Sequence, residues 1–119
     1  MPSGAKRVLI VEDEFLIALN LCDLVSRLGH EPVGPVRSVR EALEMLSSRV
    51  PDSALLDCRL ADGLSAAVAE ALRARRVPFA WLTGYEETDL PAPGEPVLRK
   101  PVTAEDLTGA LTAMLDGVS

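Results

Sequence analysis

The stretch Lys6-Arg7-Val8-Leu9-Ile10-Val11-Glu12-Asp13 decides the fold, because a β-branched apolar run ends abruptly on two carboxylates. A short run that is apolar at every position is typical of a strand buried on both faces of a parallel sheet. Such a sheet needs helices on both sides, and the rest of the chain has to supply them.

Three further apolar runs end on reactive polar residues in the same way. They are Ala54-Leu55-Leu56 before Asp57, Phe79-Ala80-Trp81-Leu82 before Thr83, and Pro96-Val97-Leu98 before Arg99-Lys100-Pro101. A weaker run, residues 31–36, is interrupted by prolines and a glycine, which suits a strand at the edge of a sheet. We therefore expect five strands.

Helix-like segments alternate with these strands. Apolar residues recur at helical spacing in residues 14–28, 39–46 after the cap Ser38, 64–75, and 104–115 after Thr103. This alternation predicts a doubly wound α/β fold with a five-stranded parallel sheet, whose ligand site lies beyond the carboxyl ends of the strands. Residues 84–95 break the alternation with prolines and glycines, so we expect the fourth helix to be shortened or absent.

Composition limits the classes of function. The 119 residues make one domain over residues 1–119, with no output domain expected, and the net charge of −6 argues against nucleic-acid binding. No stretch resembles a signal peptide or a membrane span, so a cytoplasmic protein without a membrane partner is expected. The two cysteines lack metal-binding spacing and are expected to be reduced.

The strand ends would bring three carboxylates to one edge of the sheet, where their mutual repulsion calls for a cation. Mg²⁺ suits a few oxygen ligands completed by water. We expect Asp13 and Asp57 as direct ligands, Glu12 as a ligand directly or through water, and the main-chain carbonyl of Arg59 as a further ligand.

The same edge offers the groups needed for phosphoryl transfer. A carboxylate can attack phosphorus to form an aspartyl phosphate. The Lys100 ammonium and the Thr83 hydroxyl would neutralise the phosphoryl oxygens, and Gly84 leaves room for them. Each residue alone could be an ordinary helix-cap or turn residue. Their occurrence together, in this order and at the ends of predicted strands, favours a functional site.

The chain resembles the receiver domain of two-component response regulators over about residues 6–115. The resemblance is carried by Val-Glu12-Asp13-Glu, Leu-Leu-Asp57, Leu-Thr83-Gly84 and Arg-Lys100-Pro101. It implies a flavodoxin-like strand order 2-1-3-4-5, with Asp57 as the phosphoacceptor, Mg²⁺ held by Glu12 and Asp13, and the phosphoryl group read by Thr83 and Lys100. It also implies a histidine kinase or a phosphotransfer protein as the phosphodonor.

Residues 78–85 are similar to the signature of the "FAT GUY" single-domain receivers of alphaproteobacteria, which are often tied to the general stress response. Ordinary receivers carry an aromatic residue three positions before the lysine, where this chain has Val97. We therefore expect Tyr85 to report phosphorylation, with simple anchoring of its loop as the alternative. Arg59 and Tyr85, each two residues past a site residue, are expected to tune the lifetime of the acyl phosphate.

Three functions remain open from the sequence. The favoured one is a phosphorylation-controlled switch, expected to be a monomer. It would act by protein docking or by onward phosphotransfer to a partner that the sequence does not identify. A phosphohydrolase of the haloacid-dehalogenase type would need a second aspartate two residues after Asp57, where Arg59 stands. A phosphorylation-independent scaffold would have no need for the intact set of polar residues.

Overall fold

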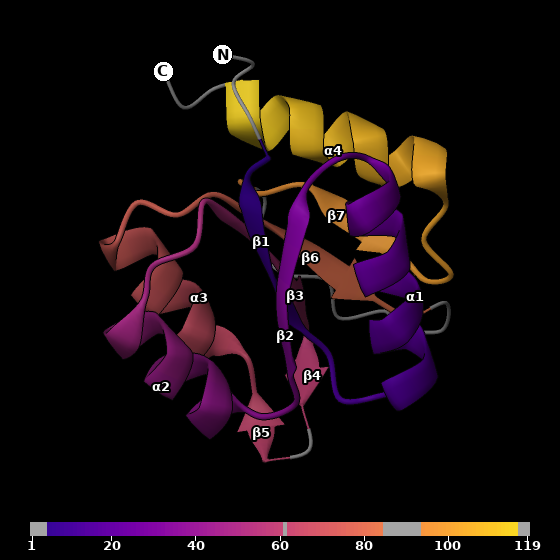
Figure 1. The fold of residues 1–119 in the computed structure, drawn as a ribbon. Coiled ribbons are helices and arrows are strands. Elements are labelled where there is room, and N and C mark those ends of the chain that lie inside the picture. The colour runs from indigo at the N-terminus through magenta and orange to yellow at the C-terminus, as the bar shows by residue number, and fades with distance from the viewer. Residues whose placement is uncertain (1–4, 61, 85–93, 117–119) are drawn as a thin grey trace.

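The fold is a five-stranded parallel sheet enclosed between helices (Figure 1). The computed structural model describes residues 5–60, 62–84 and 94–116. The sheet has the order β2-β1-β3-β6-β7 and consists of β1 (Arg7–Val11), β2 (Glu31–Val36), β3 (Ser53–Asp57), β6 (Phe79–Thr83) and β7 (Val97–Arg99). Counted along the chain, these strands follow the predicted order 2-1-3-4-5, and the weak run 31–36 takes the predicted edge position.

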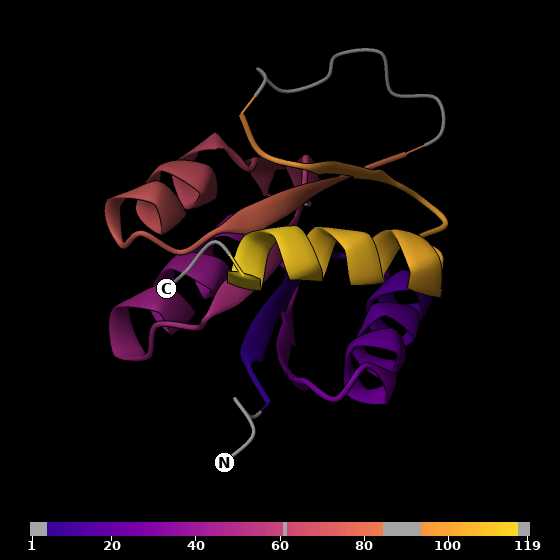
Figure 2. The ribbon, with the colours of Figure 1, turned by 90° about the horizontal axis from the view of Figure 1, so that it is seen from above.

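Helices cover both faces of the sheet. They are α1 (Phe15–Arg27), α2 (Val39–Ser48), α3 (Ala66–Ala74) and α4 (Ala104–Asp116). The helices α2 and α3 lie on one face, and α1 and α4 lie on the other, as the view from above shows (Figure 2). The prediction of a shortened or missing fourth helix concerns residues 84–95, of which 85–93 lie outside the described residues. None of the described helices is long and apolar enough to span a bilayer.

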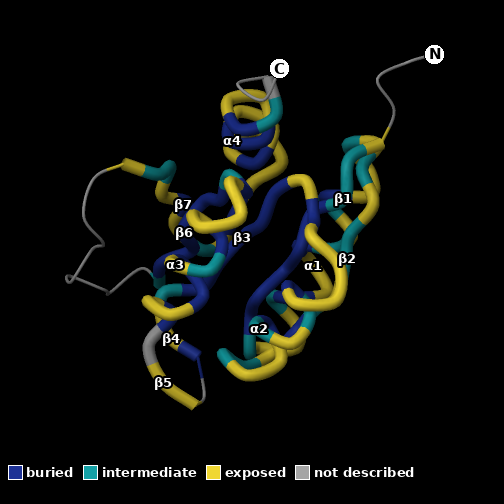
Figure 3. The backbone as a smooth tube through the Cα atoms, turned by 90° about the vertical axis from the view of Figure 1, so that its left-hand side faces the viewer, coloured by how far each residue is buried: buried dark blue, intermediate teal, exposed yellow. Residues whose placement is uncertain are grey.

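The continuous apolar run of β1 is explained by the two cores that it serves. Val8 and Ile10 are fully buried against the side chains of α1 and α4, whereas Leu9 and Val11 are fully buried against those of α2 and α3. Successive strand residues point to opposite faces, so a strand covered on both sides needs an apolar residue at every position. Figure 3 shows the resulting buried centre of the molecule.

Short polar segments begin the helices as their sequences predict. The Ser38 hydroxyl accepts a hydrogen bond from the Glu41 N–H at 3.0 Å and caps α2. The Thr103 hydroxyl accepts one from the Asp106 N–H, also at 3.0 Å, before α4. These caps satisfy backbone donors that would otherwise lack a partner in the first helical turn.

A small hairpin follows β3, and the sequence analysis did not foresee it. It pairs β4 (Arg59–Leu60) with the antiparallel β5 (Gly63–Leu64) and projects at the carboxyl end of the sheet (Figure 1). Because Leu64 belongs to this hairpin, α3 begins at Ala66, two residues later than the helical spacing predicts. The segment that follows Asp57 therefore contributes two short paired strands at the end of the sheet where the predicted site residues lie.

Candidate functional site

The carboxyl ends of β1 and β3 bring the three predicted carboxylates together. One carboxylate oxygen each from Glu12, Asp13 and Asp57 lies within 4.8 Å of the others. Glu12 and Asp57 are buried, and Asp13 is half-buried beside them. The cluster is therefore acidic and is accessible to solvent through Asp13. It lies where a doubly wound sheet has its ligand site.

Lys100 reaches this cluster from the end of β7. Its Nζ lies 3.0 Å from Oε1 of Glu12 and 3.3 Å from Oδ2 of Asp57, and it donates a hydrogen bond to each. The lysine side chain is only 12% exposed. Among the described residues, one largely buried ammonium thus faces two buried carboxylates, and the cluster keeps excess negative charge once all groups are ionised.

Burial governs the acidity of this cluster. Loss of hydration raises the pKa of Glu12 to about 7, and the nearby Asp57 charge adds to this rise, while hydrogen bonds from the Glu14 N–H and from Lys100 oppose it. Burial also raises the pKa of Asp57, against the opposing attraction of the Lys100 ammonium. The two carboxylates in turn contribute to a raised pKa of Lys100, despite its own burial. Burial and mutual repulsion therefore disfavour the ionised carboxylates, and a bound cation would stabilise them.

Thr83 ends β6 beside these groups, since it pairs in register with Arg99 just before Lys100. Its main-chain carbonyl accepts a hydrogen bond from the Lys100 N–H at 2.8 Å. Its side chain is fully buried, and among the described residues its Oγ1 finds no hydrogen-bond partner. Buried hydroxyls nearly always have a hydrogen-bond partner. A buried hydroxyl without one at a strand end is therefore available to donate a hydrogen bond to a ligand.

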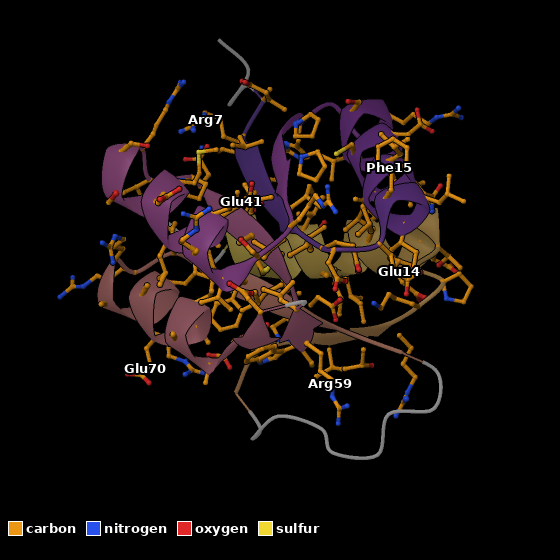
Figure 4. The ribbon with its side chains drawn as sticks, turned by 90° about the horizontal axis from the view of Figure 1, so that it is seen from below. Arg7, Glu14, Phe15, Glu41, Arg59 and Glu70 are labelled. Atoms are coloured by element: carbon orange, nitrogen blue, oxygen red, sulfur yellow. The ribbon has the colours of Figure 1, made fainter. Side chains whose placement is uncertain are left out.

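The remaining predicted site residues are placed less centrally. The Arg59 side chain is exposed and points away from the ribbon in Figure 4, which views the carboxyl ends of the strands. Gly84 is half-buried directly after Thr83. Tyr85 lies outside the described residues. Val97, three positions before Lys100, is 40% exposed on the edge strand β7.

The donor set fits Mg²⁺. Three carboxylate oxygens that converge at one edge are hard ligands of the kind that this ion prefers, and the half-buried Asp13 leaves room for water in the remaining positions. The raised pKa values of Glu12 and Asp57 point the same way, because a nearby cation favours the ionised forms that burial disfavours.

Sequence reasoning missed one buried polar side chain at this site. Ser65, just before α3, is 1% exposed, and its hydroxyl donates a hydrogen bond to the main-chain carbonyl of Asp57. A serine before an apolar helical segment signals a cap, which is a different role, so no pattern in the sequence could have indicated this contact.

Comparison with solved structures places the chain among known signalling proteins. SdrG from Sphingomonas melonis Fr1 is 40% identical, with 97% of this chain and 99% of SdrG covered and a TM-score of 0.83. The PhyR response regulator REC domain of Erythrobacter litoralis is 30% identical, with coverages of 98% and 94% and a TM-score of 0.83. The PhyR stress response regulator is 34% identical, with coverages of 93% and 45% and a TM-score of 0.79.

No protein-family model matches the chain. The chain spans between 32% and 58% of the length of the curated relatives that it matches. The similarity to the REC domain, however, runs over nearly the whole of both chains. With its sheet order and the convergence of its strand-end residues, this chain belongs to the receiver domains of two-component response regulators.

Proposed function

We propose that this protein is a phosphorylation-controlled signalling switch that accepts a phosphoryl group on Asp57. The observation that carries the proposal is the sharing of the Lys100 ammonium between Glu12 and Asp57, at 3.0 and 3.3 Å. A lysine held this way keeps a positive charge within reach of whatever is attached to the Asp57 carboxylate. The orphaned Thr83 hydroxyl supplies a donor at the end of the adjacent strand.

The chemistry is the transfer of a phosphoryl group between two side chains. A carboxylate oxygen of Asp57 attacks the phosphorus of a phosphohistidine, the new O–P bond forms as the P–N bond breaks, and the histidine nitrogen leaves with its electron pair. Lys100 and Thr83 hold the phosphoryl oxygens in this scheme. Mg²⁺, bound by Asp13, Asp57, Glu12 and the Arg59 carbonyl, would neutralise the charge that develops on them.

The proposed donors are a histidine kinase or a phosphotransfer protein. We further propose a cytoplasmic monomer, which delivers its signal by docking or by passing the phosphoryl group onward. The likeness to the PhyR stress response regulator supports a place in a stress response. The negative net charge does not favour nucleic acid as the downstream partner.

Two alternative functions predict different outcomes in one experiment. A phosphohydrolase would turn over external substrate many times, although the exposed Arg59 stands where such enzymes place their general acid. A scaffold would not react with a phosphodonor. Receiver domains act as switches, so Mg²⁺-dependent self-phosphorylation and autodephosphorylation are the only catalysis that we expect.

The test is incubation of the protein with Mg²⁺ and acetyl phosphate, followed by intact-mass measurement. The expected result is the addition of one phosphoryl group per chain, which Asp57→Asn abolishes. The matched control Asp23→Asn alters an exposed aspartate paired with Arg27 and leaves the reaction unchanged. Multiple turnover of acetyl phosphate would favour the phosphohydrolase, and the absence of any adduct would favour the scaffold.

A further inference from the structure

The loop that follows Asp57 is tied back to it by one side chain. Ser65 is 1% exposed, and its hydroxyl donates a hydrogen bond to the Asp57 carbonyl. Its own N–H donates to the next carbonyl, that of Cys58, at 3.4 Å. One residue thus holds two consecutive peptide groups, and these lie between the phosphoacceptor and Arg59.

Ser65 makes this contact instead of the one expected from its position. It is the N-cap residue of α3, yet its side chain makes no capping hydrogen bond. Ser38, the N-cap residue of α2, does accept the Glu41 N–H in the usual way. The hydroxyl of an N-cap serine normally stabilises its own helix. Here it is used to orient the backbone of the site.

Further contacts hold the residues between Asp57 and Ser65. In the β4–β5 hairpin Arg59 pairs with Leu64 and Leu60 pairs with Gly63. The Asp62 carboxylate, in the turn between those strands, accepts hydrogen bonds from the Val39 and Arg40 N–H groups at 2.8 and 3.3 Å. The turn is therefore anchored to α2, and Ser65 is the anchor at the end of the loop nearest the site.

We infer that Ser65 is a positioning residue of the cation site, which fixes the peptide groups between Asp57 and Arg59 so that a carboxylate and a carbonyl oxygen stay aimed at one Mg²⁺. The inference rests on the proposed function, which assigns both oxygens to the metal. Groups that orient metal ligands through hydrogen bonds commonly change metal affinity 10- to 100-fold when they are removed. Without the Ser65 hydroxyl, the peptide groups lose that restraint while the acidic side chains all remain.

The test is the Mg²⁺ dissociation constant of the full chain, measured by titration calorimetry at fixed pH and salt. Ser65→Ala is expected to raise the constant about tenfold. Ser65→Thr keeps the hydroxyl and should stay close to the unchanged protein. Ser38→Ala removes the N-cap serine of α2, whose hydroxyl accepts the Glu41 N–H and not a group of the site, and should lower stability without changing the constant.

A second readout separates orientation from general loosening of the fold. In the unchanged protein, saturation with Mg²⁺ should shift the carbonyl ¹³C resonance of Arg59, and this shift should shrink in Ser65→Ala and return in Ser65→Thr. If Ser65→Ala does not fold, Ser65→Cys under reducing conditions replaces it, because a thiol has a similar size but is a much weaker donor.

The outcomes distinguish this inference from the proposed function. If the unchanged protein binds Mg²⁺ and is phosphorylated, but Ser65→Ala binds the ion within twofold of it, Ser65 has only a structural role and the inference is wrong. An equal loss of affinity in Ser38→Ala would overturn it as well. Failure of the unchanged protein to bind Mg²⁺ would overturn both the inference and the proposed metal site.

Discussion

Nζ of Lys100 lies 3.0 Å from Oε1 of Glu12, although 88 positions separate the two residues. The Glu12 side chain is fully buried and that of Lys100 nearly so. The contact joins the end of β1 to the end of β7, across β3 and β6, and Asp57 at the end of β3 shares the same ammonium. The charge balance of the site therefore depends on one lysine.

Replacement of Lys100 by methionine is expected to destabilise the Mg²⁺-free protein. Loss of one partner leaves Glu12 and Asp57 buried without a counter-charge, which costs about 2 kcal/mol in a site that water partly reaches. Chemical denaturation without Mg²⁺ measures the effect. The control Arg27→Met breaks an exposed i,i+4 pair with Asp23 and should cost less than about 0.5 kcal/mol. Equal losses in the two variants would contradict the central role of Lys100.

Asp57→Asn should abolish phosphorylation and yet stabilise the Mg²⁺-free protein. Burial raises the pKa of Asp57, so its contribution to stability is present below the unfolded pKa and is lost as the pH rises through the folded pKa. At neutral pH the neutral amide avoids that loss. We expect a gain of about 1 kcal/mol, or about 4 °C in Tm for a domain of this size. A lower Tm than that of the unchanged protein, measured calorimetrically, would show that the ionised carboxylate is net stabilising.

Thr83→Val should separate stability from signalling. The Thr83 hydroxyl is buried without a hydrogen-bond partner among the described residues, so an isosteric apolar side chain should leave the free energy of unfolding unchanged or raise it by about 1 kcal/mol. The phosphorylated protein, in contrast, loses a donor to the phosphoryl group. Backbone chemical-shift changes on phosphorylation should shrink in Thr83→Val and persist in Thr83→Ser. Identical changes in both variants would remove the hydroxyl from the proposed mechanism.

Asp62→Asn tests the link between the site's loop and α2 through its pH dependence. The hydrogen bond from the Val39 N–H is the main cause that lowers the pKa of Asp62 below its usual value. A lowered pKa gives stability that is present above the unfolded pKa and is lost as the pH falls through the folded one. The Tm difference between the unchanged protein and Asp62→Asn should therefore narrow below about pH 4.

The control for this pH series is Ser38→Ala, which removes a cap of the same helix that does not titrate. The Tm difference between Ser38→Ala and the unchanged protein should therefore stay constant with pH and should not narrow in acid. If both differences vary with pH in the same way, the effect belongs to α2 as a whole and the Asp62 anchor does not explain it.

The strands were predictable because burial on both faces leaves a plain signal. Residues 8–11 are apolar without interruption, since two sides of the sheet each take alternate residues. The hairpin after Asp57 left no such signal, because two strands of two residues each are too short for any periodicity. For that reason the predicted start of the third helix at residue 64 was wrong, because Leu64 belongs to β5 and α3 begins at Ala66.

The sequence by itself determined the order of strands and helices and placed the polar residues at the strand ends, because apolar periodicity and its interruptions are local properties of the chain. Only the tertiary structure decided which of those residues meet. It shows that Lys100 bridges Glu12 and Asp57, that the Thr83 hydroxyl is buried without a hydrogen-bond partner among the described residues, and that the Ser65 hydroxyl bonds to the Asp57 carbonyl. These contacts depend on side-chain direction and on loops without periodicity, and burial then sets the acidity of Glu12 and Asp57.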